Sequence, residues 1–323
     1  MLDLLSVGAI KLDTFVVLPD ASVMCELKRP DCKICIEYGK KIPVAAFVTQ
    51  IAGSAPNVAV ALAKLQLKTA VLSCMGDDPV YHQTMAFLKR NRVMANLVKK
   101  QKGFRSSAAV VLNFKGESTQ LVDHVPHEYR LPSKLPKCRY LYISELGGKY
   151  EPLYKDAIQA AKRGVRVAFN PGAVQIAERK KIFFELLKHT DVLFLNTSEA
   201  RSVLKAADST DIRHLMTALK ALGPNYVVVT DGANGAYAYD GQHLHGSKAF
   251  PGKLIEATGA GDAFASTFLG ALLKNKGHKE ALLWGAVNAA AVIHEVGPTN
   301  GLLSQSEIQK RLQSKPAFKA KEL

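Results

Sequence analysis

From residue 138 onward, the sequence alternates short β-branched runs with amphipathic segments. Strands are predicted at 139–144, 165–170, 191–196 and 225–232, and helices between them at 151–164, 180–190 and 197–222. Because consecutive strands separated by helices are joined by crossover connections, this alternation predicts a mostly parallel sheet with helices on both faces. The expected fold class is therefore α/β.

The first third of the chain follows a different pattern. Residues 12–20, 33–43 and 45–51 are predicted as strands with no helix between them, and 106–123 as a hairpin that turns at Lys115-Gly116. These pieces predict a small β-sheet lid from 14–50 and 105–125. The main body would then comprise 1–13, 51–104 and 126–315, and 316–323 is expected to be a frayed tail.

Composition and charge exclude several classes of protein. The 323 residues are 48% hydrophobic, and the net charge is +15. The basic groups largely lack interleaved aromatic residues, which favours a solvated surface over a nucleic-acid interface. No apolar run approaches the roughly 18 residues of a membrane helix, and no basic lead precedes the first apolar run. We therefore expect a cytoplasmic protein with neither a membrane nor a nucleic acid as partner.

Cysteine and histidine offer two candidate metal sites. The five cysteines are an odd number, which favours reduced thiols, and Cys25, Cys32 and Cys35 lie close together. Three thiols could begin a zinc site, but the paired spacing of a four-cysteine zinc ribbon is missing. His243 and His245 would face the same side of a strand without a third ligand. Structural roles are favoured for both groups.

The segment EATGAGDAFAS (256–266) has the features of a helix N-terminus that binds an anion. Small residues at Gly259, Ala260 and Gly261 would let a phosphate approach amides that lack intrahelical partners. Asp262 would stand beside that anion hole as a base, or it could simply cap the helix. Phe264 occupies the third glycine position of a dinucleotide fingerprint, and the Gly-Lys-Ser/Thr of a P-loop is absent.

Several motifs, in the same order, resemble those of the ribokinase-like (PfkB) family of carbohydrate kinases. EATGAGDAFAS is similar to its C-terminal signature, and IAGSAPNVAVALAKLQ (51–66) to its N-terminal signature, with Ala52 in place of the usual first glycine. LNTSEA resembles the family's Asn-x-x-Glu motif and TDGANG its Thr-x-Gly-x-x-Gly turn. The predicted β-sheet corresponds to the family's lid.

The resemblance implies roles for individual residues. Asp262 would be the base, beside the anion hole of Gly259, Ala260 and Gly261, and Glu199 would hold Mg²⁺ through water. Substrate-binding candidates are Asp13, Gly53, Ser54, Asn57 and Glu145. Nucleotide-binding candidates are Asn196, Thr230, Gly232, Gly235, Asn288 and Gly297. Structural alternatives are a first-turn charge for Glu199, a helix cap for Asn57, an exposed loop acid for Glu145 and a buried amide for Asn288.

Glu256 stands where many family members have the Asp that begins the signature. In those members, the loop around it helps to hold a monovalent cation, often K⁺. Glutamate is one methylene longer, so its carboxylate cannot occupy the same point without a backbone shift. We therefore expect Glu256 to be a weak ligand for such a cation.

The resemblance implies a kinase that transfers the γ-phosphoryl group of ATP to a hydroxyl of a small, ribose-like or fructose-like sugar, with Mg²⁺. A nucleoside kinase on the same fold is the alternative. A non-catalytic sensor and a basic nucleic-acid-binding protein remain as competing classes. The exposed edges of a projecting lid also make a homodimer through the lid a candidate assembly.

Overall fold

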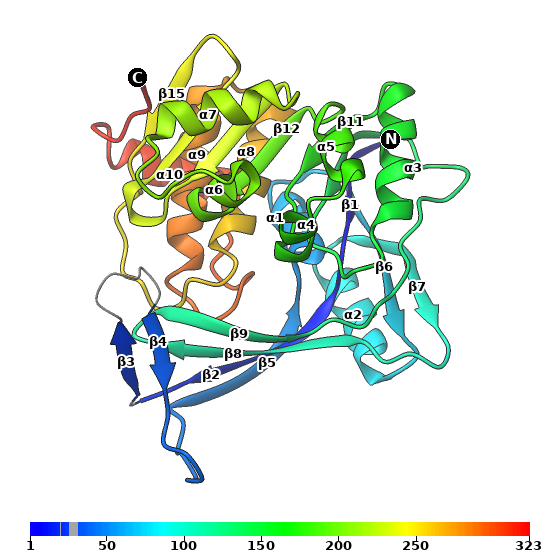
Figure 1. Cartoon of the computed structure of the whole chain (residues 1–323), viewed down its shortest axis with the longest axis vertical. Helices are drawn as coiled ribbons and strands as arrows, with labels where there is room; N and C mark the ends of the chain where they lie inside the picture. The colour runs from blue at the N-terminus through cyan, green and yellow to red at the C-terminus, as the bar shows by residue number, and fades with distance from the viewer. Residues whose placement is uncertain (20, 26–31) are drawn as a thin grey trace.

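The computed structural model describes residues 1–19, 21–25 and 32–323 (Figure 1). Its main body is built on a ten-stranded sheet in the order β16-β15-β14-β13-β12-β11-β10-β1-β6-β7. Neighbours from β13 to β7 are parallel, and β14, β15 and β16 extend the sheet with antiparallel pairs. These strands are β1 Leu2–Val7, β6 Thr69–Gly76, β7 Met94–Gln101, β10 Cys138–Ile143, β11 Arg166–Phe169, β12 Val192–Asn196, β13 Tyr226–Thr230, β14 Ala236–Tyr239, β15 Leu244–Ser247 and β16 Lys321–Glu322.

Helices cover both faces of this sheet because its central strands are apolar on both sides. In β12, Leu193 and Leu195 point into one core, and Val192 and Phe194 point into the other. The first face carries α3 Glu151–Lys162, α4 Ala173–Glu178, α5 Lys181–Leu187, α6 Thr197–Leu204 and α7 Ile212–Ala221. The second carries α1 Ser54–Lys64, α2 Pro79–Arg90, α8 Ala260–Leu273, α9 His278–Val292 and α10 Gln305–Gln313.

A separate four-stranded sheet, the lid, projects from one side of the body (Figure 1). Its order is β5-β2-β8-β9, from β2 Lys11–Val17, β5 Ala46–Ala52, β8 Ser107–Phe114 and β9 Glu117–Asp123. β2 and β8 are parallel, so the lid is mixed, whereas the other two pairs are antiparallel. The hairpin of β3 Ser22–Cys25 and β4 Cys32–Cys35 forms a third small sheet.

The α/β fold with a small separate sheet is the fold class that the sequence predicts. The tail differs from expectation, because β16 pairs with β15 and the Leu323 amide donates to the carbonyl of Leu244. Phe318 also packs edge-on against Phe250, with ring centroids 5.0 Å apart. Backbone pairing and one aromatic contact thus attach the tail, which the sequence predicts to be frayed, to the main body.

The cysteine-rich segment lies partly outside the described residues, since 26–31 and the side chains of Cys25 and Cys32 are not described. Among the residues that are described, no three His, Cys, Asp or Glu side chains gather as a metal site. Across the same residues, every helix is too short or too polar to span a bilayer.

Candidate active site

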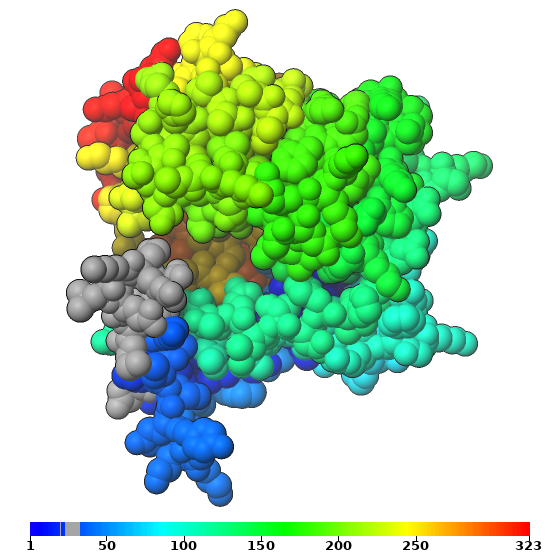
Figure 2. Space-filling model, in the orientation of Figure 1, coloured from blue at the N-terminus to red at the C-terminus, as the bar shows by residue number. Residues whose placement is uncertain are grey.

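The candidate site lies at the carboxyl edge of the parallel sheet. Glu145 follows β10, Asn170 follows β11, Asn196 ends β12 and Thr230 ends β13. Parallel strands present their carboxyl ends along one edge, where open α/β sheets bind ligands. Figure 2 shows a recess between this edge and the lid, with the C-terminal helices at its floor.

The first turn of α8 opens into this recess. Gly259 is the N-cap, with φ of 84° and no side-chain cap, and a Cβ at this position would collide with Pro298. A Cβ at Gly261 would instead meet nothing within 4 Å. The uncapped amides therefore border a cavity of about 330 Å³. This arrangement fits a phosphate group, because helix N-termini carry unsatisfied donors and positive partial charge.

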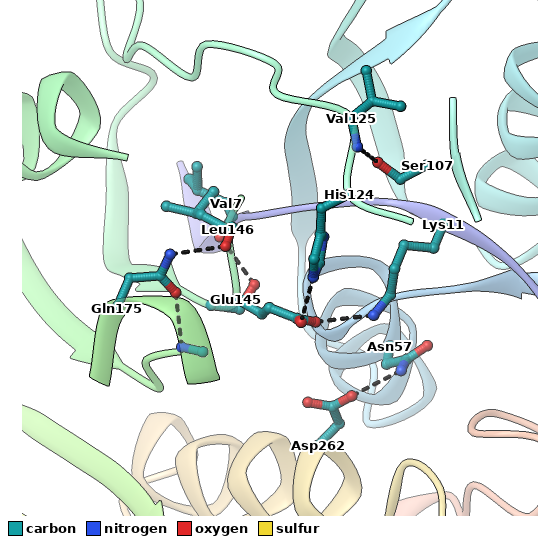
Figure 3. A network of polar contacts seen from close by, with 12 residues as sticks. Val7, Lys11, Asn57, Ser107, His124, Val125, Glu145, Leu146, Gln175 and Asp262 are labelled. Carbon is teal, nitrogen blue, oxygen red and sulfur yellow. Dashed lines mark hydrogen bonds and ion pairs between the residues drawn. The ribbon is translucent and has the colours of Figure 1, made fainter. Parts of the chain in front are cut away.

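Asp262 stands in the same first turn, against α1. The Nδ2 atom of Asn57 donates to its Oδ2 atom at 2.8 Å (Figure 3). Burial raises the pKa of Asp262, an effect that the hydrogen bonds from Asn57 and Ser54 oppose. Asn57 therefore orients the carboxylate of Asp262 as well as forming part of α1. The Oδ1 atom of Asn57 is buried and has no hydrogen-bond partner. Gly53 begins α1 with φ of 111°, close to the backbone of Ala9.

Asp13 lies on the face of the lid that points into the recess. Its residue is 3% exposed, and its Oδ1 atom has no hydrogen-bond partner. Burial raises its pKa to about 6, even though the neighbouring Lys11 lowers it. A buried acceptor without a donor indicates a place where a ligand hydroxyl would complete the hydrogen bonding.

Glu145 reaches the same place from β10, where Lys11 Nζ lies 3.0 Å from its Oε2 atom and His124 Nε2 lies 3.2 Å from its Oε1 atom (Figure 3). Burial by itself would raise the pKa of Glu145, but His124 and Lys11 lower it to about 2. The side chain is thus an ionised member of the pocket and not an exposed loop acid.

A second cavity, of about 610 Å³, lies between α8, α9 and the turn after β13. Thr230, Gly232 and Gly235 line it, and its remaining walls are largely apolar. Both cavities are lined without any lysine or arginine among the described residues. The apolar wall fits a nucleotide base, and helix amides face the place where its phosphates would lie.

Two nucleotide-binding candidates are placed outside these walls. Asn288 donates to Thr267 at 2.6 Å and accepts from the Leu303 amide at 2.9 Å, so its side chain is satisfied within the core. Gly297, with φ of 100°, lies against Gln50 of the lid.

Glu199 and Asn196 form a capping box at the start of α6 and also line the smaller cavity. Burial raises the pKa of Glu199, opposed by the Asn196 amide and reinforced by the nearby Asp262. Glu199 and Asp262 both line this cavity, and carboxylate oxygens are ligands that Mg²⁺ prefers. The structural role and the proposed metal role of Glu199 are therefore compatible.

Comparison with known proteins identifies the family. The model of the pfkB family carbohydrate kinases matches residues 16–305. The chain belongs to this family. The resemblance seen in its motifs is thus confirmed.

Similar proteins include both sugar-acid and sugar kinases. A 5-dehydro-2-deoxygluconokinase of Halalkalibacterium halodurans is 26% identical, over 85% of this chain and 89% of that protein. A ribokinase of Haemophilus influenzae is 27% identical, over 79% and 85%. The structure of Arabidopsis thaliana ribokinase with ribose and ATP has a TM-score of 0.79 at 20% identity, over 97% and 99% of the two chains.

Glu256, the predicted weak ligand for a monovalent cation, is surrounded by hydrogen-bond donors of the protein. Its buried carboxylate accepts from the Ser118 hydroxyl at 2.8 Å and the Thr258 amide at 2.7 Å, and the Gly297 amide lies 3.4 Å away. It therefore connects the lid to the loop that precedes the anion hole of this pfkB kinase.

The motifs do not include Lys11, His124 or Ser118. Lys11 and His124 pair with an acid 134 and 21 positions away, and Ser118 with one 138 positions away. Only Lys11 had a signal in the sequence. It lies two residues before Asp13 on a predicted strand, and alternate residues of a strand share a face, so both side chains would point to the same side.

Proposed function

We propose that this protein transfers the γ-phosphoryl group of ATP to a hydroxyl group of a small sugar. The observation that carries the proposal is the position of Asp262. Its carboxylate lies in the first turn of α8, beside amides that face a phosphate-sized cavity, and it is bonded to Asn57 on the acceptor side. Base and anion hole are therefore adjacent, as phosphoryl transfer requires.

The acceptor would bind between the lid and α1. Asp13 Oδ1 and Asn57 Oδ1, both buried and unpaired, are suited to accept hydrogen bonds from sugar hydroxyls. The attacking hydroxyl transfers its proton to Asp262 as its oxygen bonds to the γ-phosphorus and the bond to the ADP oxygen breaks. A buried carboxylate with a raised pKa is better suited to take this proton than an exposed one.

Mg²⁺ would bind in the part of the smaller cavity that Glu199 and Asp262 line. Glu199 would bind it through water, since Mg²⁺ gives up its water ligands reluctantly. Such an ion would supply positive charge to the phosphate oxygens, which matters because no lysine or arginine among the described residues lines either cavity. The backbone amides at the start of α8 would also stabilise the negative charge of the phosphates by donating hydrogen bonds.

The lid supports a homodimer as the assembly. Phe47 is 69% exposed, and Val110 and Leu121, which are paired across β8 and β9, are exposed on the same outer face. Pairing of two lids would cover this apolar face. Light scattering should give twice the chain mass of 35.0 kDa. A monomer at high protein concentration would contradict this proposal.

An ATP-consumption screen tests the function. Sugars and nucleosides are supplied with Mg²⁺ and K⁺, and ADP formation is measured. We expect turnover with at least one sugar that exceeds ATP hydrolysis without an acceptor. Turnover with nucleosides alone would replace the sugar by a nucleoside. Absence of turnover across the panel, with salt-sensitive binding of RNA or DNA, would favour the nucleic-acid-binding class.

A further inference from the structure

An ion cluster that none of the motifs includes lies next to Asn57 and Asp262, where we propose that the acceptor binds (Figure 3). Glu145 lies between Lys11 and His124, with its two oxygens 3.0 Å and 3.2 Å from their nitrogens (Figure 3). The Lys11 side chain is only 5% exposed, whereas those of Glu145 and His124 are partly exposed. Three segments, β2, the loop after β10 and the residue after β9, therefore meet in one charged contact.

Lys11 is the buried cation of this cluster. Within the described ranges, it is the only lysine or arginine that is buried. Its charge interacts with those of three carboxylates, Glu145, Asp13 and Asp262, and the nearest of these, Glu145, is bonded to it at 3.0 Å. The ammonium is already bonded to Glu145, and a buried ion pair is costly to break because the partner left behind stays buried and charged.

We propose that the Lys11–Glu145 pair restricts this pocket to uncharged polyhydroxy acceptors and excludes sugar acids. This inference rests on the proposed kinase function. A sugar acid would add a fourth carboxylate to a site whose ammonium group is engaged, and like charges placed together disfavour a ligand strongly. Neutral hydroxyls, in contrast, supply the donors that Asp13 Oδ1 and Asn57 Oδ1 need.

The inference separates this chain from several of its relatives. The similar kinase of Halalkalibacterium halodurans is named for a gluconate, the anion of a sugar acid. If Lys11 instead released Glu145 and bound the carboxylate of an acceptor, the pocket would prefer acids. A Lys11 bonded to Glu145 predicts a preference for the neutral ligand, and a Lys11 bonded to the acceptor predicts a preference for the acid. The two can be compared with ligands that carry either a hydroxymethyl or a carboxylate group at one carbon.

Matched open-chain acceptors test this preference. Ribitol and ribonate, and glucitol and gluconate, differ only by a terminal hydroxymethyl or carboxylate group. We expect kcat/KM for the neutral member to exceed that for the acid by at least about tenfold. Calorimetric titration of the wild-type protein without ATP should give the same order of affinity. An acid preferred in either measurement overturns the inference.

The titration also distinguishes failure of the inference from failure of the function. If no sugar, polyol, sugar acid or nucleoside supports ATP consumption, the proposed kinase function is wrong. The order of binding affinities still decides whether the pocket excludes acids. Failure of both members of each pair to bind overturns the assignment of this pocket to polyhydroxy ligands.

Variants show whether the pair causes the preference. Glu145→Gln releases the Lys11 ammonium group and should shift the acid-to-neutral ratio of kcat/KM towards the acid by about tenfold or more. Lys11→Met should weaken the binding of neutral acceptors and exclude acids further, because the charge of Glu145 is then no longer balanced by Lys11. An unchanged ratio in a folded Glu145→Gln variant overturns the role of the pair. If that variant does not fold, the wild-type comparison still tests the preference.

Lys100→Met is the matched control. Lys100 lies 2.8 Å from Asp77 in an ion pair of similar length, but both side chains are more than a third exposed. Neither residue lines either cavity. Its removal should leave the acid-to-neutral ratio unchanged. Exposed pairs of this kind contribute little to stability. A ratio that shifts equally in this control would show that net charge, and not the buried pair, sets the preference.

Discussion

The edge of the main sheet and the inner face of the lid contribute different chemistry to one recess. The sheet edge and α8 provide Asp262, Asn196, Thr230 and the amides that face the phosphate cavity. The lid provides Asp13 and Lys11, and it holds Glu256 through Ser118. Under the proposed function, the residues for phosphoryl transfer belong to the body alone, whereas the acceptor would be held by residues of both the body and the lid.

The two regions also differ in how they are stabilised. The central strands of the main sheet are buried on both faces, but the lid has a buried inner face and a partly exposed outer face. Phe15 is fully buried on the inner face, and Phe47 is largely exposed on the outer one. Because fewer buried contacts protect its backbone, the lid should open at lower free energy than the body.

The largest effect is expected in the body, from Asp262→Asn. The substitution keeps the shape but removes the base, so kcat should fall by about 10²–10⁴-fold while ATP affinity changes little. Steady-state kinetics and calorimetry measure the two quantities. Asp211→Asn, at the N-cap of α7, is the control, because asparagine caps a helix equally well. A near-normal rate in the Asp262 variant would remove this residue from the chemistry.

The next effect concerns acceptor binding by the lid. Asp13 has a pKa of about 6, raised from its ordinary value by burial, so it is ionised above this pH and protonated below it. Its ability to accept hydrogen bonds therefore declines as pH falls through 6, and acceptor affinity should decline with it. Asp13→Asn should lower affinity by about 10–100-fold and remove this pH dependence. Calorimetry between about pH 5 and 8 measures both.

Two outcomes would contradict the assignment of Asp13 to acceptor binding. If wild-type acceptor affinity is constant through pH 6, or if Asp13→Asn keeps the same inflection, Asp13 does not contact the acceptor.

A smaller effect tests whether the lid is the mobile partner. Saturating acceptor should slow amide exchange in 33–39 and 45–51 by about tenfold, because closure excludes water and protects the strands. Exchange in the body strand β13 should be unaffected, which provides an internal reference. Equal lid exchange with and without acceptor would mean that the lid does not close over it.

The smallest effect concerns Glu256 and K⁺. Three donors already surround its carboxylate, so we expect initial rates to rise only a few-fold with KCl at constant ionic strength. Glu256→Asp should increase the stimulation, since the shorter side chain leaves space for a cation. Comparison with choline chloride controls for ionic strength. A wild-type enzyme inactive without K⁺ would contradict this expectation.

Local patterns predicted the body better than the lid. Strand periodicity placed β10 to β13, and glycines with Asp262 identified the start of α8, because these signals lie within about ten residues of one another. The Lys11–Glu145 contact joins positions 134 apart, and no local pattern encodes such a pairing. β16 was missed because its residues are polar and its strand exists only by pairing with β15.

The role of Asn288 also could not be decided from sequence. An asparagine among alanines suits either a ligand contact or a buried bridge. The positions of Thr267 and Leu303, which satisfy its amide, follow from how α8, α9 and the segment before α10 pack together.

The contact of Ser118 with Glu256 has a thermodynamic consequence. Glu256 also accepts from Thr258, immediately before the anion hole, so one carboxylate is shared between the lid and the phosphate loop. Under the proposed function, a lid position that an acceptor stabilises would act through this carboxylate on the loop that binds the nucleotide. Linkage requires reciprocity, so an acceptor that tightens ATP binding by some factor is itself bound more tightly, by the same factor, when ATP is present.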